Sequence, residues 1–455
     1  MRYIYFKILF SFLLCVSQFT VHSQQSVSHP LSSYGIGDYQ LFDHGIYSAL
    51  GNIQVPFLDS SQLNYFNPAT YGGLSKGNTL YSVGVNQRIS FYSQEGAKNT
   101  RPTGNLNHIA LAFKLKNHFG MAFGLKPLAA KGYYLSERIF TGLDSIQNTY
   151  AGNGYINNLF LGFAYAPIHN KDTYIGLGFN AGYLFGNVKN ERTSQLIQGT
   201  SSSGGIMQES IHMNALTADF GFSAMQRLGK WGQLRIGATW QPTMGLNSTY
   251  ESAFYSATNL NNPSSYDTLF TLSSEGKVIQ GQAFSIGLAH KIYLKDRKRK
   301  NKTLHPELNV AFQFNQREKY SYSFNGFNDD SLFSQYPTAK RYSVGLEFRP
   351  ERFLHENMAT LGFFDKFTYR MGAYYGQLPY FDAQQNMFKE QALSLGIGIP
   401  VLAQQTLSSI NFSVMWGQRG TFASNALKED FLVIQLGTIL SPASFERWFR
   451  KRKMD

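Results

Sequence analysis

Apolar and polar residues alternate along most of the chain beyond residue 78. In residues 79–93, one face of the predicted strand carries Tyr81, Val83, Val85, Ile89 and Phe91. The other face carries Ser82, Gly84, Asn86, Arg88 and Ser90. An arginine opposite a row of valines cannot face lipid, so we expect the polar face, with Asn86 and Arg88, to line a lumen. The pattern therefore predicts membrane-crossing β-strands.

Fourteen segments carry this period of two: 79–93, 105–117, 119–134, 154–167, 172–189, 209–227, 231–246, 278–294, 305–321, 338–350, 365–377, 389–401, 408–420 and 428–440. Each is about long enough to cross a bilayer core at a barrel tilt, which takes ~9–11 residues. An even strand number is typical of a closed, single-chain bacterial barrel. With the N-terminus taken as periplasmic, the outward-side loops, such as 190–208 and 247–277, are mostly longer than the inward-side turns. The sequence thus predicts an all-β fold, a 14-stranded antiparallel transmembrane β-barrel over residues 78–440.

The first 23 residues have the parts of a secretory signal peptide. Arg2 and Lys7 form a basic start, ILFSFLLCVS is an apolar core, and the residues up to Ser23 form a small-residue cleavage site. We expect cleavage before Gln24. Cys15 is the single cysteine and lies inside this peptide, so the mature chain is expected to have no thiol.

Residues 24–77 do not follow the strand pattern and contain several turn signals, among them Asn67-Pro68 and Gly72-Gly73. They also carry many apolar residues: Leu31, Tyr34, Ile36, Leu50, Ile53, Val55, Phe57, Leu63, Tyr65 and Phe66. Such a segment is too apolar for a free tail. We predict that it folds into the lumen as a plug, or hatch.

Composition agrees with an outer surface that faces lipid. Charged residues make up 15% of the chain, below the ~25% usual for soluble domains, and aromatic residues make up another 15%. Only residues 8–21 form a continuous apolar stretch, which is too short for a membrane-spanning helix of ~20 residues. These observations predict an outer-membrane location, with outer-membrane lipid around the barrel.

The plug, the fourteen strands and Asn67-Pro68-Ala69 before the first strand together resemble the FadL/TodX-like (OmpP1) family of long-chain fatty-acid transporters. The three residues match the NPA motif at that family's hatch, and SSYGIGDY (32–39) and FLDSSQLNYFNPATYGGL (57–74) are similar to a divergent branch of it. The resemblance implies that a hydrophobic ligand binds in the lumen near Asn67, Pro68 and Ala69. It also implies a sideways exit through a gap made by a kinked third strand.

The third predicted strand, FGMAFGLKPLAAKGYY, contains Pro127. Proline has no N–H for the strand ladder and is confined to edges, breaks or bulges. Two interpretations stay open: a local bulge covered by the plug, or a lateral opening to lipid.

Two basic segments hold much of the net charge of +13. One is KDRKRKNK at 295–302, with Arg297, Lys298, Arg299 and Lys300; the other is the tail 441–455, with Trp448, Phe449 and Arg450. Both are expected in the periplasm, where they are either solvated or contact anionic lipid or a protein partner. Nucleic acid is not an expected partner outside the cytoplasm.

The sequence offers little chemistry for catalysis. The ten histidines are scattered without metal-ligand spacing. His108 and Asn180 are expected to face the lumen in structural roles. We expect no metal, no cofactor and no enzymatic activity.

The sequence is compatible with two functions. The first is passive uptake of hydrophobic small molecules through a plugged lumen with a possible lateral opening. The alternative is a non-transporting accessory subunit of an outer-membrane complex for protein secretion or barrel assembly, suggested by the basic turn and the basic aromatic tail.

Overall fold

The wall of the molecule is a closed antiparallel barrel. The computed structural model describes residues 29–33, 35–39, 45–75, 79–94, 96–142, 144–197, 203–299, 302–318, 320–324, 338–353, 361–381, 386–401, 408–420 and 427–441. The first wall strand, β2 (Thr79–Gln94), pairs with the last, β20 (Lys428–Leu440), and this pairing closes the barrel. Among the described residues, no helix is long and apolar enough to span a membrane.

Most strands run unbroken from rim to rim: β2, β3 (Ala97–Lys116), β4 (Phe119–Phe140), β5 (Ser145–His169), β6 (Thr173–Ile197), β7 (Gly204–Arg227), β16 (Ala339–Arg349), β17 (Thr368–Phe381), β18 (Met387–Pro400), β19 (Ser409–Gly420) and β20. Three others consist of two pieces each: β8 (Gln233–Gln241) with β9 (Met244–Ala257), β10 (Tyr266–Gln280) with β11 (Ala283–Tyr293), and β14 (Glu307–Arg317) with β15 (Tyr320–Phe324). Counted once each, these make fourteen wall strands, one for every predicted segment. The predicted fold class is confirmed.

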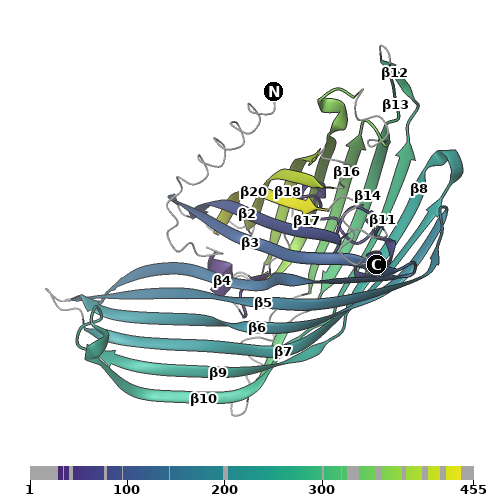
Figure 1. Ribbon diagram of the computed structural model, residues 1–455. Helices are drawn as coiled ribbons and strands as arrows, with labels where there is room; N and C mark the ends of the chain where they lie inside the picture. Colours follow the sequence, from purple (N-terminus) through teal and green to yellow (C-terminus); the bar gives the residue numbers. More distant parts are fainter. Residues whose placement is uncertain are drawn as a thin grey trace, which may run out of the picture.

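The breaks in the three divided strands lie side by side. Gln241, Ala283 and Arg317 are register partners at the ends of the pieces on one side of the break. Met244, Gln280 and Tyr320 are register partners on the other side. Pro242 follows Gln241 and has no N–H to give to a neighbour. The wall bends along this line, so β8, β11 and β14 run in a different direction from β9 and β10 (Figure 1).

Inward and outward faces alternate as the sequence predicts. On β6 the residues Leu177, Phe179, Tyr183 and Phe185 are exposed on the outside, whereas Asn180 is buried inside. The span from Ile175 to Phe185 covers ten residue steps, or roughly 33 Å of strand. Tilted at a usual barrel angle, this gives an apolar band about 25 Å tall, the height expected for an outer-membrane barrel.

The strands on one side are much longer than the sequence predicts. β5, β6 and β7 have 25, 25 and 24 residues, whereas β16 has only 11. The predicted loops 190–208 and 247–277 are largely strand, and this part of the prediction is wrong. On β6 the outward positions from Asn187 to Gln195 are polar, so apolar residues no longer mark the outer face as they do lower down.

The inward face of the long strands explains why they continue. Ile156, Val188, Met213, Leu246 and Val278 come from five different strands and pack into one buried cluster. This core forms beyond the apolar band of β6. One side of the barrel is therefore a tall wall built on its own hydrophobic core.

The described residues of the N-terminal segment (29–33, 35–39 and 45–75) lie inside the barrel. It contains η1 (Pro30–Ser33), β1 (Asp38–Tyr39), η2 (Ser48–Leu50) and η3 (Pro68–Gly73). η2 packs against β16–β19, and η3 packs against β3–β7, so the segment touches opposite sides of the wall. Its apolar residues, including Leu50, Ile53, Leu63 and Tyr71, are fully buried.

Small residues on the inward face of the wall let this backbone approach closely. A Cβ on Gly372 of β17 would lie 2.2 Å from the Gly51 nitrogen, and a Cβ on Gly178 of β6 would lie 2.5 Å from the Pro68 carbonyl carbon. Both distances are well below contact distance. The strand glycines therefore make room for the segment.

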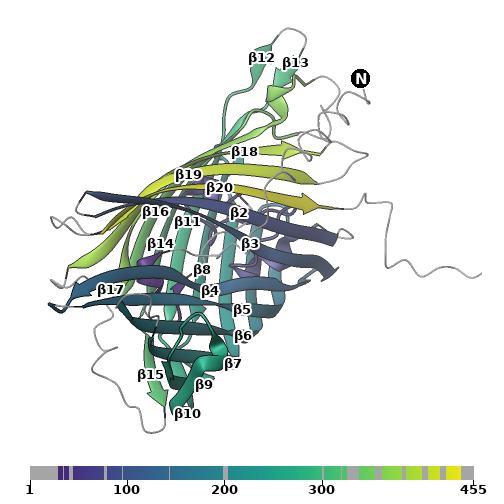
Figure 2. The same cartoon turned by 90° about the vertical axis from the view of Figure 1, so that its left-hand side faces the viewer.

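The remaining elements lie at the rims. β12 (Arg297–Arg299) and β13 (Lys302–Leu304) form a separate hairpin between β11 and β14, and Figure 2 shows it projecting beyond the barrel strands. η4 (Gly229–Trp231) and η6 (Phe364–Lys366) lie in connections at the same rim, and η5 (Pro263–Ser265) lies at the other. The rim with the hairpin also has the short turns after β3, β5 and β7. Short turns are typical of the periplasmic side.

The loss of stability caused by an arginine on the outward face of β6 should depend on whether the arginine lies inside or outside the apolar band. We expect Ala181→Arg, in the middle of the apolar band, to lower the free energy of unfolding from lipid vesicles by about 2–4 kcal/mol. Thr193→Arg faces outward on the same strand but above the band, and it should have almost no effect. Equilibrium urea unfolding in vesicles measures both variants, and equal costs would contradict the assigned band.

Candidate functional site

The wall is interrupted between β3 and β4. Their ladder runs from Lys116–Phe119 only as far as Ile109–Leu125, although both strands continue well beyond it. Pro127 follows two residues later, at a register shift in the pairing of β4 with β5. Since proline cannot donate to a ladder, Pro127 stands where the third wall strand leaves the second. Figure 1 shows the ribbons of β3 and β4 spreading apart towards one end.

The N-terminal segment pairs with the edge of β4 that β3 leaves. The Gly132 carbonyl accepts from the His29 N–H at 2.9 Å, and the Gly132 N–H donates to Ser32 Oγ at 3.0 Å. Next along the edge, Asp38 and Tyr39 pair with Ala130 and Ala129. The segment thus supplies hydrogen-bond partners that β3 does not.

Asp38 and Tyr39 also reach other parts of the wall. The Asp38 carboxylate accepts from Arg419 Nη1 of β19 at 2.8 Å. The Tyr39 ring stacks on Tyr320 of β15 at 5.3 Å and lies 4.6 Å from the Arg317 guanidinium. Two consecutive residues therefore join three separated parts of the wall.

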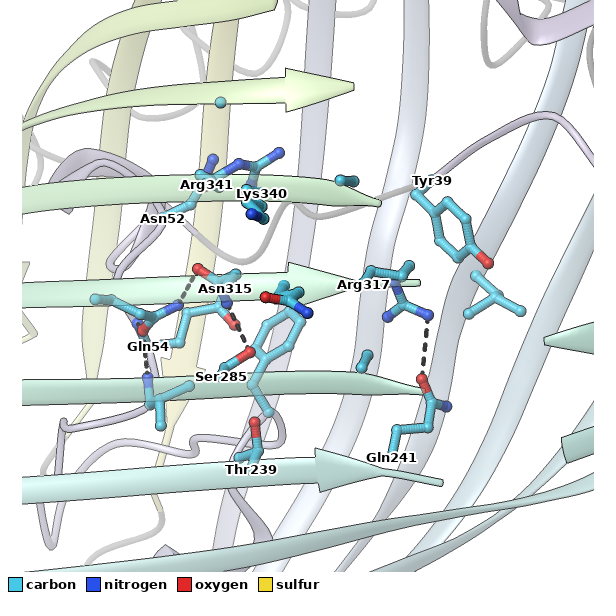
Figure 3. A pocket seen from close by; sticks show the side chains of 18 of the residues that line it. Tyr39, Asn52, Gln54, Thr239, Gln241, Ser285, Asn315, Arg317, Lys340 and Arg341 are labelled. Atoms are coloured by element: carbon cyan, nitrogen blue, oxygen red, sulfur yellow. Dashed lines mark hydrogen bonds between the residues drawn. The ribbon is translucent and has the colours of Figure 1, made fainter. Parts of the chain in front are cut away.

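A cavity of about 240 Å³ lies in the lumen beside this crossing. Figure 3 shows its polar side, where Asn315 donates to Ser285 and Arg317 donates to Gln241 at 3.2 Å. Asn315 also accepts from Gln313 Nε2. Its apolar side includes Phe66, Pro127 and Leu128. The cavity can hold a small molecule that has both an apolar part and a polar end.

Most of the charged side chains around the cavity form ion pairs with one another. Glu390 accepts from Arg419 and, at 2.8 Å, from the Tyr374 hydroxyl, and Arg341 lies 3.8 Å from it. On the opposite side the Lys126 ammonium is 4.0 Å from Asp219. It also lies 5.5 Å from the Phe160 ring centroid, a cation–π distance.

A second, smaller cavity lies at the interruption of the wall. Its lining includes Gly104 and Leu106 of β3 and Leu125, Pro127 and Ala130 of β4. Pro127 lines both this side cavity and the luminal cavity. The luminal space and the wall interruption therefore meet at this residue.

The predicted NPA motif lies elsewhere, deep under β6 and β7. Asn67 caps η3: its side-chain oxygen accepts from the Ala69 N–H, and its amide nitrogen donates to the carbonyls of Val55 (2.9 Å) and Phe222 (3.0 Å). Pro68 and Ala69 are buried with it. These contacts are all internal, and the motif lines neither cavity.

The four predicted lumen-facing residues all lie inside the wall. His108 Nε2 is 2.7 Å from Ser82 Oγ, and its Nδ1 is 3.2 Å from the Tyr65 hydroxyl. Asn180 accepts from the Tyr71 hydroxyl at 3.0 Å, and burial raises the pKa of that hydroxyl well above its usual range, so it stays a donor.

Asn86 bonds to Asn107 on the neighbouring strand, and Arg88 donates to Glu429 at 2.7 Å beneath the Phe431 ring. His108 and Asn180 therefore hold the N-terminal segment, whereas Asn86 and Arg88 join wall strands to one another.

The predicted basic residues fall partly in the described region. Arg297 and Lys298 are exposed on the projecting hairpin, and Arg299 belongs to the same strand. Lys300, Trp448, Phe449 and Arg450 lie outside the described residues, as does the signal peptide.

Sequence reasoning missed two groups of buried ion pairs. In one, Glu429 contacts His29 (2.8 Å) and Arg88, close to Arg419. In the other, Arg349 contacts Asp59 (3.2 Å) and Glu347 (3.2 Å). The available signal was charge at inward positions of apolar strands, because such charges are expected to be paired.

Asp59 joins the N-terminal segment to the second group. Burial alone would raise the pKa of this carboxyl, but the guanidinium of Arg349 and then the ammonium of Lys291 outweigh burial and hold the pKa below its usual range. Ser61 Oγ and the Ser61 N–H also donate to it, at 2.7 and 2.9 Å. In the described part of the chain, no three His, Cys, Asp or Glu side chains are grouped to hold a metal ion.

This architecture defines a class by its fold: closed fourteen-stranded β-barrels with the fold of hydrocarbon channels. The structure is similar to a FadL homologue of Pseudomonas aeruginosa (TM-score 0.53, 11% identity, 89% of this chain and 98% of that one). It is also similar to the toluene transporter TbuX of Ralstonia pickettii (0.53, 14%, 89% and 99%) and to the monoaromatic hydrocarbon channel CymD (0.50, 13%, 89% and 99%). The predicted resemblance to FadL/TodX-like barrels is confirmed, and these identities establish the fold alone. The similar structures are transporters and channels rather than enzymes.

The family of the chain itself is a different one. Residues 5–455 match the family model described as BamG, so the chain belongs to the BamG family. No curated protein matches the sequence.

The ion pair between Asp59 and Arg349 should make the position of the N-terminal segment inside the barrel depend on pH. Because the pKa of Asp59 is lowered in the folded state, its contribution is complete above the unfolded pKa of ~3.9 and is lost as the pH falls below that value. We expect hydrogen exchange in residues 45–75, corrected for intrinsic rates, to be unchanged from pH 8 to 5 and faster below about pH 4. Asp59→Asn should exchange faster at all these pH values. A loss of protection already at pH 6 would contradict this role.

Proposed function

We propose that this outer-membrane barrel admits hydrophobic small molecules from outside, and that they leave sideways between β3 and β4. In this proposal residues 24–77 are the plug, and Pro127 marks the lateral opening. The observation that carries the proposal is that Pro127 lines both the luminal cavity and the side cavity at the end of the β3–β4 ladder.

The geometry supports such a route in two ways. The ladder is missing over the outer parts of β3 and β4, so a molecule passing there need not break hydrogen bonds between these two strands. The residues beside the opening, such as Leu106, Leu125 and Tyr155, are apolar or aromatic and suit a hydrophobic molecule. Similar structures named as a toluene transporter and a hydrocarbon channel support the same ligand class.

Filling the side cavity should stop this passage. We expect wild-type protein in liposomes to take up toluene or a fatty acid faster than empty vesicles, and Gly104→Trp to reduce the rate towards that of empty vesicles. Thr193→Trp, on the polar outer surface of β6, is the control and should not change uptake. Pro127→Ala should also slow uptake if the ladder extends when the proline is removed.

No uptake above empty vesicles, with the barrel folded, would exclude transport. Equal uptake by wild type and Gly104→Trp would exclude this route.

A second function is favoured by the projecting hairpin β12–β13. A pure transporter has no need of a basic hairpin beyond its rim, whereas an accessory subunit of a secretion or barrel-assembly complex needs a contact surface. Arg297 and Lys298 are exposed there, where an acidic protein surface can reach them. The internal contacts of Asn67 and the ion-paired N-terminal segment are also compatible with a lumen that stays closed.

Charge reversal tests the accessory role. We expect affinity capture from native membranes to recover outer-membrane or periplasmic partners with the wild type, and fewer of them with Arg297→Glu/Lys298→Glu. Lys98→Glu/Arg101→Glu makes the same charge change at the opposite rim and should leave capture unchanged. Removal of residues 441–455 tests the tail separately. Partner recovery that is insensitive to both changes would argue against this function.

A further inference from the structure

The edge of β4 that β3 leaves stays open beyond the N-terminal segment. That segment pairs with the edge as far as Gly132, and the described residues supply no partner on this side for residues 133–140. On the other side, the β4–β5 ladder continues to its last pair, Phe140 with Ser145. Figure 1 shows the ribbon of β3 apart from β4 at this end. The last part of β4 is therefore an edge strand, although it belongs to a closed barrel.

The backbone groups that point to this open edge can be identified from Gly132. Its N–H donates to Ser32 Oγ and its carbonyl accepts from the His29 N–H, so both groups point away from β5. Successive residues of an antiparallel strand direct their backbone groups to opposite sides. The register with β5 has no shift beyond Ala129, so this alternation continues to the end of the strand. The N–H and carbonyl groups that point to the open edge are those of Tyr134, Ser136, Arg138 and Phe140.

This edge lies beyond the apolar band of β6. Through β5, Tyr134 is in register with Glu191, which is roughly 20 Å of strand beyond Phe185. All side chains from Tyr134 to Phe140 are exposed, and these two aromatic residues are 59% and 78% exposed. An exposed edge strand with apolar side chains is a template for pairing with another chain, unless a bulge or a proline interrupts it. Residues 133–140 contain neither.

The charges of the edge strand indicate which segment fits beside it. The Arg138 guanidinium lies 5.7 Å from the Phe140 ring and, in the described part of the chain, pairs with no carboxylate. The adjacent Glu137 already accepts from Asn148 Nδ2 at 3.1 Å and from the Tyr150 hydroxyl at 3.0 Å. Opposite charges on directly paired residues stabilise neighbouring strands. A strand with a carboxylate opposite Arg138 therefore complements this edge.

A second copy of this chain does not supply that carboxylate. Residues that oppose each other in an antiparallel pair direct their backbone groups either both towards the partner strand or both away from it. Two β4 edges would therefore place Arg138 opposite a residue of the same alternate set, and never opposite Glu137. None of that set, Tyr134, Ser136, Arg138 and Phe140, is acidic. The charge pattern thus favours a different protein.

We propose that the open edge of β4 binds an extended segment of another protein, which adds to the wall as an antiparallel strand. The segment carries apolar side chains and a carboxylate that lies opposite Arg138. The N-terminal segment already binds the same edge in this manner, since β1 pairs antiparallel with β4. The site uses neither cavity and lies at the rim opposite the hairpin β12–β13, so it is independent of transport and of the hairpin contact.

The test uses the mature full-length protein in nanodiscs, with hydrogen exchange resolved to single amides. The probe is a synthetic peptide of alternating threonine and valine with one central glutamate. The amides of Leu135, Glu137 and Ile139 point to β5 and should exchange slowly throughout. We expect the alternate amides, those of Tyr134, Ser136, Arg138 and Phe140, to exchange fast in the free protein and slowly once the peptide binds.

Two substitutions separate strand addition from a general surface contact. Ser136→Pro removes one N–H from the open edge, where proline leaves the β5 ladder intact, and it should weaken peptide binding about tenfold. Ser136→Ala is the matched control: it also loses the hydroxyl that accepts from Gln147 at 3.2 Å, but it keeps the N–H and should bind like the wild type. Heat-modifiable migration on gels confirms that each variant is folded.

A second peptide tests the charge. Lysine in place of the peptide's glutamate should weaken binding to the wild type about two- to fivefold, and Arg138→Glu should reverse this preference. Edge amides that exchange slowly before any peptide is added would overturn the proposal, because the chain itself would then cover the edge. So would the absence of binding to the wild type, equal binding by Ser136→Pro and Ser136→Ala, or a peptide preference that Arg138→Glu leaves unchanged.

Discussion

The structure depends on one constraint: a strand within a bilayer has no water to bond, so its backbone groups need partners in the protein. The closed ladder meets this need around the barrel, but β3 and β4 part after Ile109 and Leu125. Near the break, residues of the N-terminal segment take the place of β3, with β1 along Ala129 and Ala130 and η1 at Gly132. The interior segment therefore completes the wall as well as occupying the space inside it.

Buried charge then fixes where that segment lies. Asp38 bonds to Arg419, and Asp59 bonds to Arg349, so two acidic residues of the segment are tied to distant strands. Both pairs are largely shielded from solvent, so breaking either one leaves a poorly solvated charge without its partner. Because the contacts join residues far apart in sequence, they form only in a nearly complete barrel. The correct position of the segment and the closure of the wall thus require each other.

Much of the wall could be predicted because a lipid-facing strand shows a period of two that does not depend on its neighbours. The tall wall could not, since beyond Phe185 the outer face is polar and only the cluster around Val188 and Met213 shows that the strands continue. Pro127 indicated a break in the hydrogen-bond ladder of its strand. It did not indicate which neighbouring strand loses its pairing there, because strand pairing joins residues that are far apart in the sequence. The NPA motif precedes β2, and the internal bonding of Asn67 depends on Val55 and Phe222, which local sequence does not place beside it.

The unequal heights of the two walls have a consequence for neighbours in the membrane. A barrel of even height looks the same from every direction in the membrane plane. Here one flank carries strands of 24–25 residues and the other strands of 11–14. The barrel therefore has two different flanks in the membrane plane: a tall one built on β5–β7 and a low one on which the described strands are about half as long. A neighbouring molecule in the membrane therefore contacts a different surface on each flank of the barrel.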